Sequence, residues 1–237
     1  MTVTTTTLTP RPPLARRTTV ALKLLMAVTG AFFAFFVLAH MYGNLKLLAG
    51  EEAFNTYAHH LRTMGEPIFP YAGLLWVLRL VLIASLIAHV YAALTLWSRS
   101  GAARQTKYAM ARKVLTSTTM RWGGVAIFVF VIWHLIQFTI VKVSVNPEVA
   151  SATVVDNPYK LVVATFQVWW MTLIYVLAMV ALWLHLAHGI YSAQQTLGWT
   201  GTPAKGIRAK GISHALTALI VVGFLIPPLS ILFGLVK

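Results

Sequence analysis

The sequence predicts an all-α membrane protein with five transmembrane helices, and two observations carry that prediction. The 237 residues are 58% hydrophobic and only 10% charged, with a mean hydropathy of +0.75, which a soluble domain does not show. Several long apolar runs approach the ~20 residues that a helix needs to cross a bilayer. The runs lack the alternation of a membrane barrel, and lipid requires backbone groups to be satisfied within each segment, so we expect helices.

The chain has a formal net charge of +14, from 19 Lys+Arg against 5 Asp+Glu. We attribute this excess to the orientation of the protein in the membrane and not to a nucleic-acid partner. Basic residues gather before the first apolar run, at 98–121 and at 205–210, whereas the acidic residues fall within 51–66 and 148–156. Cytoplasmic loops carry the excess of Lys and Arg. We therefore expect a multi-pass protein of the cell (cytoplasmic) membrane with its N-terminus in the cytoplasm and its C-terminus outside. The absence of cysteine excludes disulfides, and this chain alone cannot hold an iron–sulfur cluster through thiolates.

In chain order, residues 1–18 are expected to form a disordered cytoplasmic arm, because prolines disfavour helix there. Residues 19–237 are expected to form a single five-helix transmembrane domain. Apolar residues recur at helical spacing in the outer loop 47–66, which predicts a helix on the membrane surface. Asn157 and Pro158 form a typical helix start, a cap followed by proline at the first position. The expected spans are 20–45, 67–97 or 70–97, 122–143, 159–197 and 212–236.

Histidines fall on each of the first four spans, and an ionisable side chain inside a membrane is by default a functional candidate. The spans alternate in direction, and a helix rises ~1.5 Å per residue. His40 and His134 therefore come together in the outer half, and His89 comes in the inner half with either His185 or His188. Haem iron takes one axial ligand from each face. Two histidine pairs at two depths predict that the first four spans form a haem-binding bundle for two haems b.

Other residues in the spans fit the same interpretation. Gly30 and Gly124 each lie ten residues before an outer histidine, ~15 Å inward, where a small residue lets a helix pass close to the inner ring. Arg79 is placed to pair with a propionate of the outer haem, or to snorkel outward, and Arg121 and Trp122 are placed to hold inner propionates. The alternatives are a haemless anchor with structural histidines and a transporter or channel whose histidines line one continuous proton path.

Several motifs together carry a resemblance that covers residues 20–235. They are HMYGNLK at 40–46, FNxYA at 54–58, LWxxR at 75–79, AH at 88–89, WH at 133–134, HxxxGIYS at 185–192 and LG at 197–198. With these motifs the chain resembles the cytochrome b membrane-anchor subunit of diheme succinate:quinone oxidoreductases (succinate dehydrogenase or fumarate reductase). It is most similar to the actinobacterial-like branch of the b558 family, in which one five-span chain holds two haems b.

The resemblance implies a complete set of axial ligands. The fourth-span ligand of the family stands four residues before a glycine, which selects His185 over His188. By the resemblance, His40 and His134 ligate the outer (distal) haem, and His89 and His185 ligate the inner (proximal) haem. His188 becomes a neighbour that contacts a propionate or the partner interface.

The resemblance also implies the partners. The chain would anchor a flavoprotein subunit and an iron–sulfur subunit on the cytoplasmic face, and succinate would be oxidised on another chain. Electrons would pass through the two haems to a quinone, menaquinone in this branch. Some diheme relatives carry a glutamate two residues before the fourth-span ligand for compensating proton transfer, but Trp183 stands there in this sequence. That departure puts a transmembrane proton route of this type in doubt.

A quinone site needs an apolar slot, donors to the quinone carbonyls and a proton source. The outer end of the bundle offers these groups, with Glu66 as the candidate proton carrier or, alternatively, a charge at a helix N-terminus. The inner face near Arg121 and Trp122 is the rival location. A haem-b membrane subunit of a formate dehydrogenase or hydrogenase is the remaining alternative function. The outer candidates are Asn44, Lys46, His59, His60, Arg62, Glu66 and Tyr71.

Overall fold

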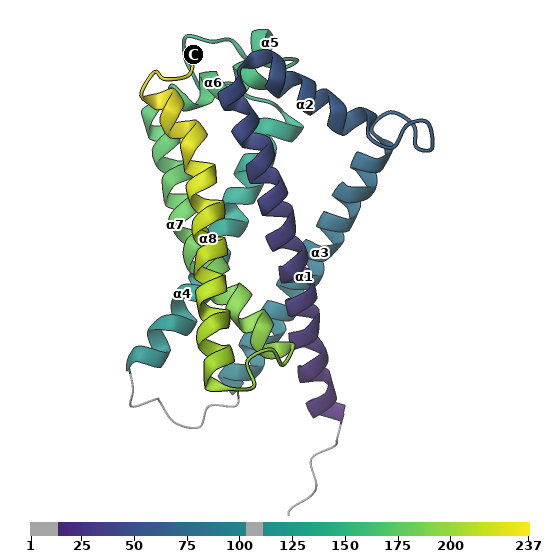
Figure 1. Cartoon of the computed structure of the whole chain (residues 1–237), viewed down its shortest axis with the longest axis vertical. Helices are drawn as coiled ribbons and strands as arrows, with labels where there is room; N and C mark the ends of the chain where they lie inside the picture. The colour runs from purple at the N-terminus through teal and green to yellow at the C-terminus, as the bar shows by residue number, and fades with distance from the viewer. Residues whose placement is uncertain (1–13, 103–110) are drawn as a thin grey trace, which may run out of the picture.

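The computed structural model describes residues 14–102 and 111–237, and within them the side chains of 19–101 and 118–237. All secondary structure in these residues is helical (Figure 1). In chain order the elements are α1 (Leu14–Leu45), the 3₁₀ turn η1 (Lys46–Ala49), α2 (Glu51–Thr63), α3 (Gly73–Ala102), α4 (Ala111–Leu135), the π-helical η2 (Ile136–Ile140), α5 (Ser151–Val154), α6 (Pro158–Phe166), α7 (Trp169–Thr196) and α8 (Pro203–Leu232).

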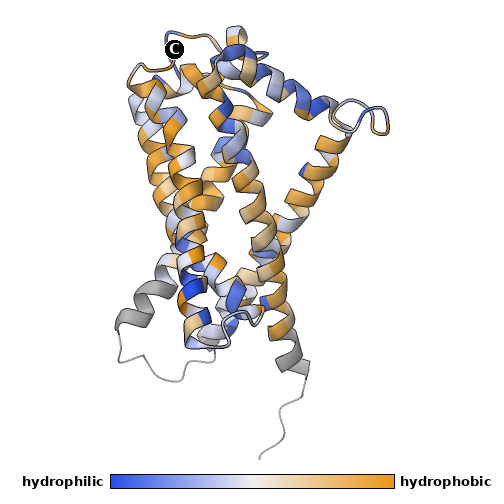
Figure 2. Ribbon diagram, viewed as in Figure 1, coloured by the Kyte–Doolittle hydropathy of each residue, from blue (hydrophilic) through white to orange (hydrophobic). Residues whose placement is uncertain are grey.

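Five of these helices are long and apolar enough to cross a membrane, which confirms the predicted number of spans. They are α1, α3, α4 with η2, α7 and α8. Figure 2 shows hydrophobic residues along the middle of the bundle and hydrophilic residues toward its two ends. We call the end that carries α2, α5, α6 and the C-terminus the cap end (Figure 1). The opposite end is called the basic end, after Arg99, Arg121, Lys205, Arg208 and Lys210.

The helices of the first three spans begin at residues other than those predicted. Residues 14–18, expected in the arm, begin α1, and the rest of the arm lies outside the described residues. The second span begins at Gly73 and not at Pro67 or Pro70, because the chain turns through both prolines first. Glu66 therefore lies well before α3 and not at its N-terminus. The helix of the third span begins before residue 122, within the segment that we expected to be a basic loop.

The predicted fourth span, 159–197, is two helices. α6 ends at Phe166, Val168 is extended, and the membrane helix α7 begins at Trp169. The Thr172 hydroxyl donates to the Phe166 carbonyl over 3.1 Å and so satisfies an acceptor at the end of α6.

The fifth span also begins earlier than predicted. The Thr202 side chain caps α8 by accepting from the Lys205 backbone N–H, and Pro203 stands at the first position. The basic residues at 205–210 therefore lie on the first turns of α8 and not in a loop.

α7 is the central helix of the bundle, since it packs against α1, α4 and α8. α8 also lies close to α1, because Gly223 leaves the space that the side chain of Met41 fills. α3 packs mainly on α1. Figure 1 shows α3 leaning away from α1 toward the cap end, where α2 spans the distance between them.

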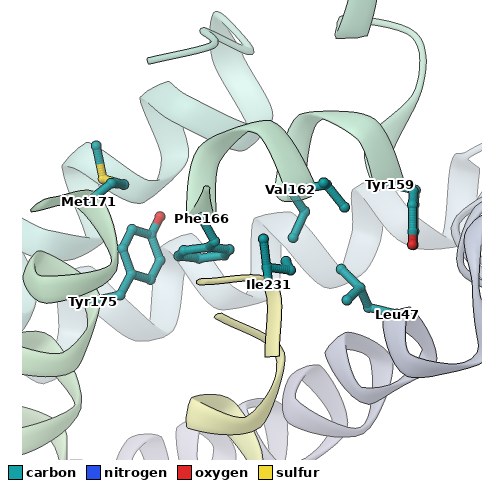
Figure 3. Close-up of a cluster of buried hydrophobic side chains, with 8 residues drawn as sticks. Leu47, Tyr159, Val162, Phe166, Met171, Tyr175 and Ile231 are labelled. Atoms are coloured by element: carbon teal, nitrogen blue, oxygen red, sulfur yellow. The ribbon is translucent and has the colours of Figure 1, made fainter. Parts of the chain in front are cut away.

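A buried apolar cluster ties these helices together at the cap end (Figure 3). Leu47 of η1, Tyr159 of α6 and Ile231 of α8 belong to it, with exposed fractions of 1%, 7% and 3%. The ring of Tyr175 meets that of Phe166 edge to face, with centroids 4.8 Å apart. The cluster fixes α6 and the start of α7 against the ends of α1 and α8.

Polar side chains hold α2 onto α6. Asn157 caps α6 as predicted, because its side-chain oxygen accepts from the Lys160 backbone N–H. The same oxygen accepts from Asn55 Nδ2 over 3.0 Å, and Asn157 Nδ2 donates to Glu51 Oε1 over 2.6 Å. The structure confirms a helix within the loop 47–66, and these hydrogen bonds join it to the bundle.

Candidate functional site

The structure brings the intramembrane histidines together as two pairs. The ring centroids of His40 and His134 are 5.9 Å apart, with ring planes at 81°. Those of His89 and His185 are 6.3 Å apart, with ring planes at 62°. All four side chains are half-buried. Each pair joins two different helices, α1 with α4 and α3 with α7, so the histidines form two separate sites and not one continuous path.

The pair nearer the basic end, His89 and His185, is held by its neighbours on both sides. His89 Nδ1 lies 2.9 Å from Thr29 Oγ1 of α1, and His185 Nδ1 lies 3.4 Å from the Met120 carbonyl of α4. The Thr29 hydroxyl already donates to the Leu25 carbonyl over 2.7 Å. Its oxygen is therefore the acceptor for a proton on His89 Nδ1.

Two glycines lie directly against this pair. A Cβ on Gly30 would lie 3.5 Å from His89 Cε1, and a Cβ on Gly124 would lie 3.3 Å from His185 Cε1. Both glycines come from the helices that carry the other histidine pair, ten residues earlier in each. At ~1.5 Å of rise per residue, the two pairs are therefore ~15 Å apart along the bundle.

The pair nearer the cap end, His40 and His134, has a different environment. The ring of His40 stacks on Phe36 at 5.5 Å and lies 5.7 Å from the ring of Phe224. His134 Nδ1 lies 3.2 Å from the Tyr175 hydroxyl oxygen. That hydroxyl donates to Gln137 Oε1 over 3.0 Å, so its oxygen accepts from His134 Nδ1–H.

These hydrogen bonds select one tautomer for three of the four histidines. Met120 offers a carbonyl, and the hydroxyl hydrogens of Thr29 and Tyr175 are directed elsewhere. A proton on Nδ1 satisfies each contact and leaves Nε2 with a lone pair, which is the form of imidazole that binds a metal. A histidine ligand commonly donates its other N–H to a protein acceptor in this way.

The donor set fits two haems. An iron atom between two imidazole nitrogens, with bonds of ~2 Å, places the ring centres roughly 6 Å apart. Both pairs have this separation. Among the described residues, no three His, Asp or Glu side chains gather as a site for a bare metal ion. Two histidines instead suit a group such as haem, which supplies the remaining ligands of its own iron.

The basic residues that we expected to meet propionates have protein partners. The Arg79 guanidinium lies 5.0 Å over the Trp76 ring on the same helix. Arg121 lies 5.0 Å over the Trp97 ring and donates to Ser100 Oγ over 3.2 Å, so it links α4 to the end of α3. Trp122 is 63% exposed.

His188 lies half-buried one turn beyond His185 on α7. No hydrogen bond or ring contact ties its side chain to the described residues. Its expected contact with a propionate or with the partner interface stays a prediction.

The residues expected around a quinone fall at two places on the cap end. Asn44 and Lys46 lie where α1 ends: Asn44 Nδ2 donates to the His40 carbonyl over 2.8 Å, and Lys46 Nζ lies 5.0 Å over the Tyr42 ring. The others lie where α2 turns into α3, with the rings of His59 and Tyr71 6.4 Å apart. They include His60, Arg62 and Glu66.

Tyr57 of α2 lies beside the first of these places. Its ring fills the space that a side chain at Gly43 would need, with the hydroxyl 2.9 Å from such a Cβ, and it meets the ring of Tyr42 at 6.4 Å. Burial raises the pKa of Tyr57, Tyr42 raises it further, and Lys46 lowers it. The phenol therefore stays a hydrogen-bond donor at neutral pH.

Sequence reasoning did not single out Thr29, Tyr175 or Gln137 as partners of the histidines. A tyrosine and a glutamine within apolar spans are signals of interhelical hydrogen bonding, and Thr29 precedes a glycine that was singled out. Their pairing with particular histidines depends on helix rotation, which the sequence does not state.

Comparison with known proteins points to a family of membrane subunits. The succinate dehydrogenase cytochrome b558 subunit of Bacillus subtilis (strain 168) is 26% identical over 204 residues, covering 85% of this chain and 89% of that protein. No solved structure matches. The family described as "Succinate dehydrogenase/Fumarate reductase transmembrane subunit" matches residues 97–226, more than half of the chain. The chain therefore belongs to the succinate dehydrogenase/fumarate reductase transmembrane subunit family.

Proposed function

We propose that this chain is the diheme cytochrome b of a succinate:quinone oxidoreductase. In this proposal His40 and His134 hold one haem b nearer the cap end, and His89 and His185 hold a second nearer the basic end. The first four spans form the haem-binding bundle, and 19–237 act as one domain. When bound, the two haems would supply one-electron carriers across the membrane between an iron–sulfur subunit and menaquinone.

The observation that carries the proposal is the arrangement of the four histidines as two pairs with acceptors at Nδ1. The rings of each pair are separated by the distance that a bis-imidazole iron needs. Three of the four Nδ1 atoms face protein acceptors, which leaves Nε2 for the metal. The name of the Bacillus subtilis relative, a cytochrome b558, supports haem b as the group.

The test is the haem content of the purified complex and of single variants. We expect two haems b per chain and a b-type α-band in the reduced-minus-oxidised spectrum. His40→Ala and His134→Ala each lose one haem, and His89→Ala and His185→Ala each lose the other. His188→Ala is the matched control and retains both. Absence of an α-band, or two haems in His185→Ala, contradicts the proposal.

We further propose that the basic end faces the cytoplasm and carries a flavoprotein and an iron–sulfur subunit, which hold the succinate site. All five acidic residues of the chain lie within 51–66 and 148–156, at the cap end. Because the chain has no cysteine, single cysteines report orientation cleanly. Glu148→Cys is expected to react with a membrane-impermeant maleimide in intact cells, and Lys210→Cys only after lysis. The reverse pattern contradicts the orientation.

The quinone is proposed to bind at the cap end. Lys46 and the phenol of Tyr57 supply donors beside Asn44, and Glu66, Tyr71, His60 and Arg62 lie where α2 turns into α3. A photoreactive quinone that labels peptides of 42–71 supports this location. Labelling confined to peptides around Arg121 and Trp122 places the quinone at the basic end instead.

A further inference from the structure

We propose that Tyr175 and Gln137 form a directional hydrogen-bond chain that fixes the tautomer and the ring orientation of His134, and thereby sets the reduction potential of the cap-end haem. The inference deepens the proposed function and rests on it, because it treats His134 as an axial ligand. Tyr175 and Gln137 are positioning residues in this proposal. They act through the imidazole and do not contact the iron.

The hydrogen-bond chain runs through four helical elements in a fixed direction. His134 Nδ1–H of α4 donates to the Tyr175 oxygen of α7 (3.2 Å), and the Tyr175 hydroxyl donates to Gln137 Oε1 of η2 (3.0 Å). Gln137 Nε2 donates to Thr165 Oγ1 of α6 over 3.3 Å. The Thr165 hydroxyl donates to the Leu161 carbonyl over 2.7 Å.

Each link sets the direction of the link before it. Because the hydrogen of Thr165 is directed to a carbonyl, its oxygen can only accept from Gln137. The amide nitrogen of Gln137 therefore faces Thr165, and its carbonyl oxygen faces Tyr175. The phenol hydrogen is used on that oxygen, so Tyr175 can only accept from His134. The hydrogen bond of Thr165 in α6 thus determines which nitrogen of the His134 imidazole carries the proton.

Packing leaves these groups no alternative partner in water. Gln137 and Thr165 are 0% exposed, and Tyr175 is 8% exposed. The ring of Tyr175 meets the ring of Phe166 edge to face at 4.8 Å (Figure 3). It also meets the ring of Phe130 edge to face at 4.9 Å. A buried polar group without a partner is costly, which favours the fully bonded arrangement over any other.

The local backbone is specialised at the same place. Helix α4 changes to the π-helical η2 at Ile136, and Gln137 is its first fully buried residue. π-helical turns are rare and often occur at functional sites. Here the wider turn accompanies a glutamine that lies within the core, three residues after the histidine that the chain orients.

The hydrogen-bond chain would affect the reduction potential of a haem bound through His134. An acceptor at Nδ1 increases the basicity of the ligand and orients its ring, and a more electron-donating ligand favours the ferric over the ferrous state. His40, the other proposed ligand of the pair, has aromatic neighbours and no such acceptor among the residues that the structure describes. The potential of the cap-end haem is therefore tuned from one side, through Tyr175.

The experiment uses the purified complex and measures the midpoint potential of each haem by potentiometric titration. Tyr175→Phe is expected to retain both haems and to raise the midpoint of the cap-end haem. Loss of one hydrogen bond corresponds to a three- to tenfold change in the reduction equilibrium, at most ~59 mV for a one-electron couple. The EPR line shape of that haem should change as well, because it depends on the angle between the two imidazole planes. Tyr159→Phe is the matched control, since it removes a hydroxyl that donates to the Lys237 carbonyl, and it should change neither readout.

Gln137→Leu gives a second, independent test. Without its acceptor, the Tyr175 hydroxyl is free to turn and donate to His134 Nδ1, which favours the tautomer that carries the proton on Nε2 and cannot bind iron. We therefore expect cap-end haem content to fall in Gln137→Leu and to recover in the double variant Gln137→Leu/Tyr175→Phe, where the competing donor is gone. Retention of the basic-end haem in each variant shows that the bundle is folded.

The outcomes separate the two proposals. If His134→Ala loses a haem but Tyr175→Phe leaves the cap-end midpoint and EPR spectrum unchanged, the positioning chain is wrong and the ligand assignment stands. A double variant with no more cap-end haem than Gln137→Leu also overturns the inference. If His134→Ala retains both haems, the proposed ligand set itself is wrong.

Discussion

The hydrogen bond between Thr29 and His89 offers the sharpest test of how the basic-end site is built. Thr29 is 7% exposed, and its hydroxyl donates to the Leu25 carbonyl while accepting from His89 Nδ1 at 2.9 Å. Thr29→Val keeps the shape and the β-branch of the side chain but removes the acceptor for His89 together with the donor to the Leu25 carbonyl. The proton on His89 Nδ1 is then left in the bundle without a partner.

The magnitude follows from that one lost contact. An unsatisfied buried donor costs ~1–3 kcal/mol, and 1–2 kcal/mol corresponds to a factor of roughly 5–30 in an equilibrium constant. We expect the basic-end haem to bind that much more weakly in Thr29→Val, and its midpoint potential to rise because the ligand becomes less basic. Thr29→Ser retains the oxygen and should behave as the native protein does.

The assay is haem content per chain together with a potentiometric titration that resolves the two haems. The cap-end haem serves as the internal control, because its proposed ligands lie ~15 Å away along the helices. Unchanged occupancy and midpoint of the basic-end haem in Thr29→Val would refute the reasoning. So would a Thr29→Ser variant that loses as much as Thr29→Val, because the effect would then be one of packing.

Three further predictions follow from contacts elsewhere in the bundle. Gly124→Leu should lose the basic-end haem and retain the other, since even a Cβ there would lie 3.3 Å from His185. Gly211→Leu is the control, because a Cβ at Gly211 would have nothing within 4 Å. Equal haem loss in both variants would contradict the prediction. Asn157→Ala should lower the free energy of unfolding of the purified protein by about 1–2 kcal/mol, because the helix cap and the hydrogen bonds to α2 are lost. Each kcal/mol corresponds to ~2–4 °C in melting temperature. An unchanged thermal transition would argue against the link between α2 and α6. Glu66→Gln should slow quinone reduction while succinate still reduces both haems, and a normal quinone reductase rate would remove Glu66 as the proton carrier.

The prediction of five membrane helices from sequence succeeded because the number of spans depends on the length and order of the apolar runs. Long apolar runs must form helices in lipid whatever surrounds them. Helix ends were less accurate, since they depend on local partners. α8 begins at Pro203 because Thr202 caps it, and the fourth span is divided because Val168 takes an extended conformation after α6. Neither event changes the hydropathy of the run.

The sequence by itself determined the number of spans, the charge bias of the two ends and the depth of each histidine. These properties follow from residue order, because a helix in lipid has one length and one rise per residue. Only the tertiary structure decided which side chains meet: Thr29 with His89, Gly124 with His185, and Tyr175 and Gln137 with His134. Those meetings depend on the rotation of each helix about its axis and on the π-helical turn in η2. Packing among α1, α4 and α7 sets both.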